Sequence, residues 1–337
     1  MKSSRLALGV SAIAFVGMVV TGCSGSGGPN STPTPSPTPT PTPGGTPTPT
    51  PSATYSTVAE IDAADGDKRY NAVGVRWQVQ TSPTGRGKFA DGTSFTFDYV
   101  KSDNTYRVSY PTPAPSGSPA PTPTPTPTPT PSTTPSPTVI AFSAGSGVTV
   151  GDTTTYTKSS GSTTDTMRVI VPQQGGVDLT YTRFLAFDHD ETGTASDWHY
   201  RTVYGILTYA SDRPTTGTAT YSTSIYGDAT RASTDYLLTG NSSGTFSVDF
   251  AGNTVTSTLD LKGRSDPSSS LVDFGSFTGS GTIVGVGYTG TLTGSNSASG
   301  EFGGAFFGPQ AAEYGYAWYL NGSDFTANGF ASGKKNP

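Results

Sequence analysis

The chain of 337 residues is poor in the side chains that build disulfides, metal centres and charged interfaces. Its single cysteine, Cys23, excludes any disulfide within the chain. Two histidines exclude a histidine-rich metal site. Charged residues make up 13% and the formal net charge is −5, so there is no polybasic surface and nucleic acid is a poor candidate partner. The chain instead has 43 glycines, 28 prolines, 17 tyrosines and 16 phenylalanines, a composition typical of linkers, turns and β-strands.

The N-terminus has the order of a secretion signal. Lys2 and Arg5 precede an apolar run over residues 6–20, which is short for a membrane span of about 20 residues. Residues 20–23, Val-Thr-Gly-Cys, resemble the lipobox of bacterial lipoproteins. The resemblance implies that residues 1–22 are a lipoprotein signal peptide and that Cys23 carries acyl chains such as palmitate. Because Ser24 follows, rather than the aspartate of an inner-membrane retention signal, we expect lipid anchoring at the outer membrane of a Gram-negative cell.

Two tracts of Pro and Thr interrupt the chain, at residues 23–52 and 111–138. Proline fixes φ and lacks an N–H donor, so we expect both to be disordered or extended as polyproline II, the first as a stalk. The second joins two domains or is a loop inserted into one. Residues 55–110 are too few to fold well alone without disulfides. The insertion is therefore favoured, with residues 53–178 forming a small β-rich subdomain.

Apolar and polar residues alternate in short runs over residues 179–337, and glycines and asparagines separate the runs. Phe246, Val248 and Phe250 share one strand face, and Val255, Leu259 and Leu261 share another. We predict an all-β fold in which an eight-stranded antiparallel up-and-down β-barrel follows the small subdomain. A transmembrane β-barrel also alternates, but the lipobox and the stalk favour a tethered, soluble barrel. Further strands are predicted at residues 181–188, 200–209, 219–225, 288–293, 300–307, 314–320 and 325–331.

The end of the chain resembles one family. Residues 300–313, GEFGGAFFGPQAAE, and the closing residues 329–335, GFASGKK, resemble the last barrel strands of transferrin-binding-protein-B-like surface lipoproteins. Residues 214–221 and 244–250 are similar to two of its earlier strands. The resemblance covers about 179–335 and implies a barrel preceded by a β-rich handle, a surface location and a binding role. The full receptors have two such lobes and this chain has one, so no partner interface can be transferred to it. We expect Glu313 to be a hydrogen-bonding carboxylate at the barrel end.

Ligand-capable side chains gather in one stretch, where residues 188–191 read Asp-His-Asp-Glu and residues 197–199 read Asp-Trp-His. His189 and His199 are therefore the candidates for a metal or haem contact. A solvated loop between two strands explains the same residues more simply, so we predict no metal and no cofactor. There is no Gly-x-Ser-x-Gly elbow, and no catalytic residue is predicted.

Three functions fit these observations. The preferred one is a monomeric surface lipoprotein, held to the membrane by its N-terminal lipid, that binds a host protein, an iron carrier or haem. The alternative is a structural or adhesive envelope lipoprotein without a captured solute. A polysaccharide-active enzyme is disfavoured, because the sequence reveals no pair of carboxylates for glycoside hydrolysis.

Overall fold

The computed structural model describes residues 54–79, 87–89, 95–110, 137–192 and 197–337. The chain divides into two compact units, Met1–Thr50 and Pro51–Pro337, and every described residue lies in the second. The predicted signal peptide, Cys23, the stalk and residues 111–136 of the second tract lie outside the described residues. Within the described part, no helix has both the length and the apolar character needed to cross a membrane.

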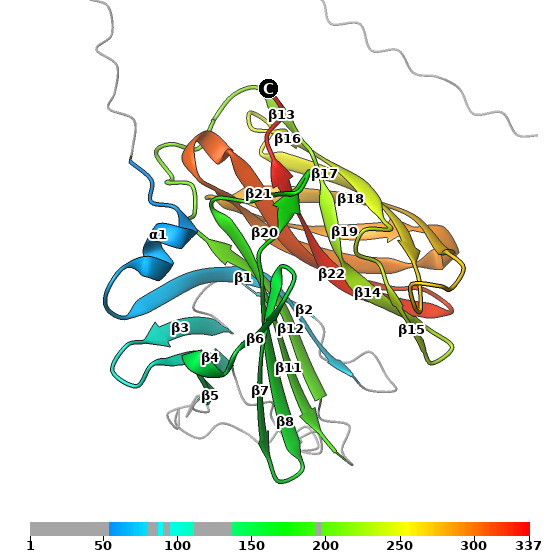
Figure 1. Ribbon diagram of the computed structural model, residues 1–337. Helices are drawn as coiled ribbons and strands as arrows, with labels where there is room; N and C mark the ends of the chain where they lie inside the picture. The colour runs from blue at the N-terminus through cyan, green and yellow to red at the C-terminus, as the bar shows by residue number, and fades with distance from the viewer. Residues whose placement is uncertain (1–53, 80–86, 90–94, 111–136, 193–196) are drawn as a thin grey trace, which may run out of the picture. The chain divides into compact units, whose positions relative to one another are not determined.

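The first sheet is antiparallel and follows a short capped helix, α1 (Val58–Ala63). In α1, Thr57 Oγ1 accepts a hydrogen bond from the Glu60 backbone N–H, and the Glu60 carboxylate accepts one from Thr57 N–H. The strand order is β5-β4-β3-β1-β12-β11-β8-β7-β6, with β2 also paired to β1 (Figure 1). Its strands are β1 (Lys68–Val79), β2 (Gly87–Phe89), β3 (Thr96–Val100), β4 (Thr105–Tyr110), β5 (Thr138–Ser143), β6 (Val148–Val150), β7 (Thr153–Ser160), β8 (Thr163–Ile170), β11 (Thr182–Glu191) and β12 (Asp197–Gly205).

The second Pro/Thr tract lies between two strands that pair with each other. Tyr110 at the end of β4 is the partner of Thr138 at the start of β5. Because Tyr110 and Thr138 are partners at one hairpin end, we propose that the tract is an insertion into one sheet rather than a linker between domains. A short 3₁₀ turn, η1 (Ala144–Ser146), then leads from β5 to β6.

The second sheet forms the barrel, in the order β13-β16-β17-β18-β19-β20-β21-β22-β14-β15. Bridges from Tyr221 to Lys335 and from Leu237 to Arg264 join the outer strands to the rest and close it. Ten strands stand where the sequence predicts eight, because short irregular segments at 222–223 and 238–242 separate β13 from β14 and β15 from β16. The strands are β13 (Thr218–Tyr221), β14 (Ser224–Arg231), β15 (Thr234–Leu237), β16 (Ser243–Asp249), β17 (Thr254–Gly263), β18 (Val272–Val284), β19 (Gly287–Gly294), β20 (Ser299–Phe307), β21 (Glu313–Asn321) and β22 (Phe325–Lys334).

The barrel interior is aromatic, as the predicted alternation requires. Phe246, Val248 and Phe250 are all buried, and the ring of Phe246 stacks on Tyr314 at 4.0 Å between centroids. The sequence missed β18, which is rich in glycine and serine. A Cβ on Gly281 would lie 3.0 Å from the ring of Phe302, so the absence of side chains there makes room for a large ring from β20.

Two strands that the sequence placed in the barrel belong to the first sheet. β11 pairs with β8 and β12, and β12 pairs with β1. Alternation identifies a strand but not its partners, and here both faces are covered: Phe184 to Phe187 are buried without interruption. Since residues 182–205 pair outside the barrel, we propose that the barrel begins with β13 rather than at residue 179.

The two sheets of the Pro51–Pro337 unit meet at an apolar seam. Phe184 of β11 stacks on Phe330 of β22 with centroids 4.5 Å apart, and Val203 packs in the same cluster as Ala317. Glu313, at the start of β21, is 2% exposed and accepts three hydrogen bonds from residues 180–182. This confirms its predicted role as a hydrogen-bonding carboxylate at the barrel end. The seam is thus held by packed rings and by hydrogen bonds to the buried Glu313 carboxylate.

Polar contacts also hold the start of the described chain against the connection between the sheets. The Tyr55 hydroxyl donates to Asp212 at 2.9 Å and accepts from the Tyr209 N–H at 2.8 Å. The Gln310 N–H, in the turn η3 (Pro309–Ala311), donates to the same Asp212 carboxylate.

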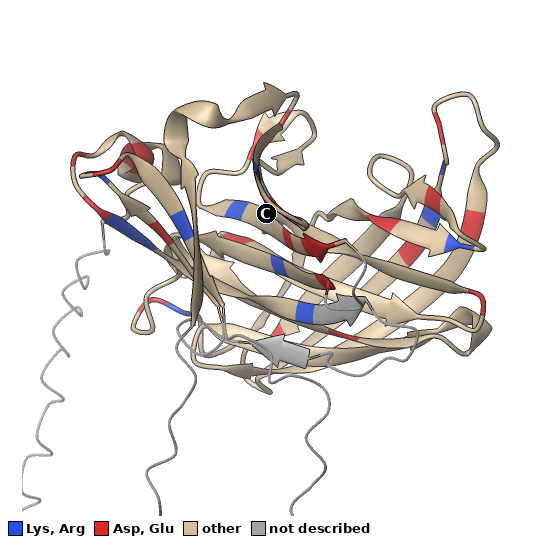
Figure 2. Cartoon of the chain, turned by 90° about the horizontal axis from the view of Figure 1, so that it is seen from below, with Lys and Arg blue, Asp and Glu red and all other residues tan. Residues whose placement is uncertain are grey.

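Charged residues elsewhere are scattered over the strands, with both signs interspersed (Figure 2).

Candidate functional site

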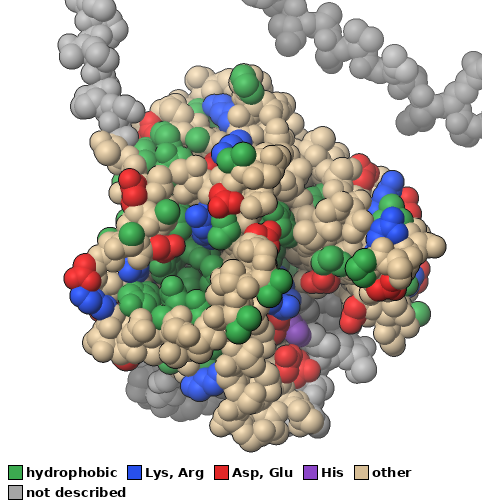
Figure 3. Space-filling view, in the orientation of Figure 1, with side chains coloured by type: hydrophobic (Ala, Val, Ile, Leu, Met, Phe, Trp, Pro, Cys, Tyr) green, Lys and Arg blue, Asp and Glu red, His purple; other side chains and the backbone are tan. Residues whose placement is uncertain are grey.

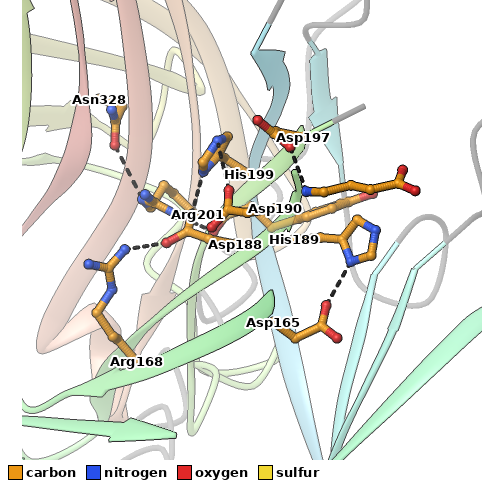
Figure 4. A network of polar contacts seen from close by, with 11 residues as sticks. Asp165, Arg168, Asp188, His189, Asp190, Asp197, His199, Arg201 and Asn328 are labelled. Atoms are coloured by element: carbon orange, nitrogen blue, oxygen red, sulfur yellow. Dashed lines mark hydrogen bonds and ion pairs between the residues drawn. The ribbon is translucent and has the colours of Figure 1, made fainter. Parts of the chain in front are cut away.

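The two histidines lie on neighbouring strands but on opposite faces of the first sheet. In the register of β11 and β12, Asp188 is the partner of His199, whereas His189 is the partner of Trp198. Successive side chains of a strand point to opposite faces, so the imidazoles of His189 and His199 diverge (Figure 4). Both were predicted to lie in a solvated loop, and the structure places them within strands instead. The two rings therefore cannot bind one metal or one haem iron together.

On one face, His189 pairs with a buried carboxylate. Its Nδ1 lies 2.7 Å from Asp165 Oδ1, and its ring packs 5.7 Å from that of Tyr110. The hydrogen bond to Asp165 raises the pKa of His189 above its ordinary value, against the lowering effect of burial. The pair belongs to the margin of the aromatic core and has a structural role.

On the other face, Asp188 is the centre of a network of cations. Its carboxylate contacts Arg168, lies 2.6 Å from Arg201 Nη1 and lies 2.5 Å from His199 Nδ1 (Figure 4). Burial acts to raise the pKa of Asp188, but Arg201, His199 and Arg168 outweigh it and hold that pKa well below its usual range. Arg201 also donates to Asn328 of β22, which connects the network to the barrel. This arrangement gives the buried Asp188 carboxylate its counter-ions at the seam.

No group of three or more His, Cys, Asp or Glu side chains able to hold a metal occurs within the described ranges. The neighbouring Asp190 lies at the margin of the same network, 4.0 Å from His199 Nε2. Burial, with the like charges of Asp188 and Asp197, raises the pKa of Asp190 although His199 opposes the shift. The polar stretch identified in the sequence is thus a set of internal ion pairs.

A hollow lined by tyrosines opens at the end of the first sheet beside α1. Figure 3 shows a recess with a hydrophobic floor and charged side chains around its rim. Three of the lining tyrosines come from different strands: Tyr70 from β1, Tyr99 from β3 and Tyr106 from β4. The rim residues are Asp62, Asp65, Lys68, Lys101 and Asn104. We call this recess the tyrosine hollow.

The tyrosine hollow carries an ordered set of polar contacts. Tyr70 donates its hydroxyl to Asp62 at 2.8 Å, and the Lys68 ammonium lies 4.4 Å from the centroid of the Tyr99 ring. Lys101 forms an ion pair with Asp65. Burial, followed by nearby Tyr156, Asp62 and Tyr99, raises the pKa of Tyr106 to about 12. Burial also raises the pKa of Tyr70, so both phenols are neutral at physiological pH.

Sequence reasoning did not find this hollow. Among the tyrosines of the later strands, four are buried and Tyr209 is 47% exposed; the buried ones are Tyr200, Tyr204, Tyr314 and Tyr316. The lining residues of the hollow span 82 positions, from Asp62 to Ala144, and the sheet order brings β1, β3 and β4 together. The hydrogen-bonded residues Asp62 and Tyr70 lie only eight positions apart in the sequence.

Comparison with known proteins identifies the barrel. Residues 213–335 match the family model of the C-lobe and N-lobe beta barrels of Tf-binding protein B. No curated protein matches the chain. The matched range begins just before β13 and ends just after β22, so it coincides with the second sheet.

Several solved structures are similar at low identity. They include a double mutant of transferrin binding protein B from Haemophilus parasuis, with 17% identity over 58% of this chain and 39% of that one, at a TM-score of 0.40. Transferrin binding protein B from Neisseria meningitidis has 11% identity over 80% of this chain and 77% of that one, at 0.34. HpuA from Kingella denitrificans, solved with human haemoglobin, has 11% identity over 69% and 84%, at 0.34. The chain thus spans well under half of the first of these proteins. Over residues 213–335, its second sheet is similar to the Tf-binding protein B lobe barrels.

Proposed function

We propose that this protein is a lipid-anchored binding protein of the outer membrane that captures an iron-carrier protein of a host. The observation that carries the proposal is the family match of residues 213–335, because the family is named for transferrin binding. The predicted lipobox at Cys23 and the Pro/Thr stalk support a location at the cell surface.

The geometry of the described residues supports binding rather than catalysis. In the most densely charged cluster, the Asp188 carboxylate is engaged in internal ion pairs with Arg168, His199 and Arg201. The tyrosine hollow is an open feature that presents rings and hydrogen-bonding groups at the surface. Tyrosines of this kind supply much of the contact area in protein interfaces.

The test is capture by the anchored protein. Bacterial cells that express the full chain are incubated with labelled transferrin, lactoferrin or haemoglobin, and saturable retention of one of them is expected. A Cys23→Ser chain, assayed after purification on beads, separates binding from anchoring. If neither cells nor beads retain an iron carrier, the structural or adhesive alternative replaces the proposal.

A further inference from the structure

We propose that the tyrosine hollow is a binding site for an organic ammonium group, and that Lys68 occupies part of it when no ligand is bound. The chemistry is shared by a free alkylamine or quaternary amine and by a lysine side chain of a partner protein. The inference does not depend on which iron carrier, if any, the barrel family implies for this chain.

The rings give the first reason. An ammonium is attracted to the face of an aromatic ring within about 6 Å of its centroid. Lys68 Nζ already lies 4.4 Å from the Tyr99 centroid, which shows that this face is accessible to a cation. The Tyr106 ring lies 5.3 Å from Tyr99 at an interplanar angle of 54°, so the two rings form adjoining walls. A cation seated there meets more than one ring.

The charges give the second reason. Lys101 is neutralised by Asp65, whereas Asp62 accepts from the Tyr70 phenol and has no cationic partner among the described residues. Lys68 rests on a ring and has no carboxylate partner in the same part of the chain. Asp62 and Lys68 are thus two rim charges that are not paired with each other. An ammonium ligand between the rings and Asp62 gives the carboxylate a counter-ion, and the long Lys68 side chain can turn toward solvent.

Competition between Lys68 and the ligand makes the site testable. A Lys68→Met variant keeps the aliphatic stem but removes the competing charge, so affinity for an external ammonium rises by about fivefold, the size of one exposed cation–π contact. An Asp62→Asn variant keeps an acceptor for Tyr70 but lacks the charge, and affinity falls by up to about fivefold, the size of one exposed ion pair. Lys101→Met is the matched control, because it removes a rim ammonium that Asp65 already neutralises.

The experiment titrates the full chain with tetramethylammonium chloride and follows tyrosine fluorescence and ligand NMR line widths, at constant ionic strength with sodium chloride as the blank. Sodium acetate serves as the anionic probe. Tighter tetramethylammonium binding by Lys68→Met, weaker binding by Asp62→Asn and no change for Lys101→Met support the proposal. No saturable binding by the folded Lys68→Met chain, or tighter binding of acetate than of the cation by wild type, overturns it. Equal unfolding midpoints in urea establish that the variants are folded.

A second arm distinguishes the two sources of the ammonium. In the cell-capture assay, loss of a retained protein partner in Asp62→Asn shows that the ammonium is a lysine of that partner. If Asp62→Asn still retains the partner that wild type retains but has lost tetramethylammonium binding, the site is assigned to a free amine. If no iron carrier is captured, the tetramethylammonium titration can still be interpreted. The proposed function and the ammonium site can therefore be refuted independently.

Discussion

The Glu313 carboxylate is expected to contribute to stability by joining the two sheets at the seam. Its Oε1 accepts from the Thr180 N–H at 2.7 Å, and its Oε2 accepts from Tyr181 N–H at 2.9 Å and from the Thr182 hydroxyl at 3.0 Å. Glu313→Gln keeps one oxygen, which can accept two of the three bonds, and turns an NH₂ group toward the remaining donor.

The magnitude follows from the lost contacts. A hydrogen bond to a charged group contributes about 1.5–3 kcal/mol, so losing one makes Glu313→Gln about 2 kcal/mol less stable, before the weakening of the other two. Glu313→Ala loses all three and leaves buried donors, which costs about 4 kcal/mol or more. Equilibrium unfolding of the full chain in urea, followed by tryptophan fluorescence, measures both values.

The control is Glu301→Gln on neighbouring β20. Glu301 is half-buried and accepts from the Tyr319 hydroxyl at 2.9 Å, a bond that a glutamine oxygen can also accept. We expect a loss below about 1 kcal/mol there. A Glu313→Gln chain as stable as wild type, within about 0.5 kcal/mol, would refute the view that this carboxylate joins the sheets.

Three further predictions follow from the other polar contacts and from Cys23. Because the pKa of His189 is raised above 6.5, its pair with Asp165 stabilises the fold fully below about pH 6.5, and this contribution is lost as the pH rises through the folded-state value. In urea unfolding at pH 5.5 and 8.5, His189→Gln should therefore reduce the difference in stability between the two pH values, and an unchanged difference would contradict the assignment. Asp188→Asn removes the buried carboxylate that Arg168, His199 and Arg201 share and should cost about 3–5 kcal/mol by thermal unfolding, whereas a shift of less than about 1 °C would show that the network is dispensable. Cys23→Ser should move the protein from the membrane fraction to the soluble one, and unchanged partitioning would remove the lipid anchor.

The strands of the barrel were predictable because each has a solvent-exposed face and a buried face. Alternation over residues 245–261 gave the inward residues of β16 and β17 correctly, including Phe246 and Leu259. β18 was missed because its inward positions include Gly279 and Gly281, whose space is filled by a ring from another strand. Sheet membership was not predictable for β11 and β12, since pairing between β1 and β12 joins residues more than 100 positions apart.

For the candidate site, too, the local sequence predicted the residues but not the strand pairing that places them. The sequence identified the polar residues around His189 and His199, but a strand register is needed to see that their side chains point to opposite faces. Glu313 was assigned correctly because its place after a Gly-Pro turn marks a strand start at the barrel end. The tyrosine hollow depends on the order β4-β3-β1, which no local pattern encodes.

The most direct test of the central claim is capture of an iron carrier by the anchored protein. Cells that display the wild-type chain should retain labelled transferrin, lactoferrin or haemoglobin saturably, and Cys23→Ser cells, whose protein is not anchored, should retain none. Equal retention by wild-type and Cys23→Ser cells would contradict the account. So would a result in which neither cell type retains a carrier and the purified chain on beads also binds none of the three.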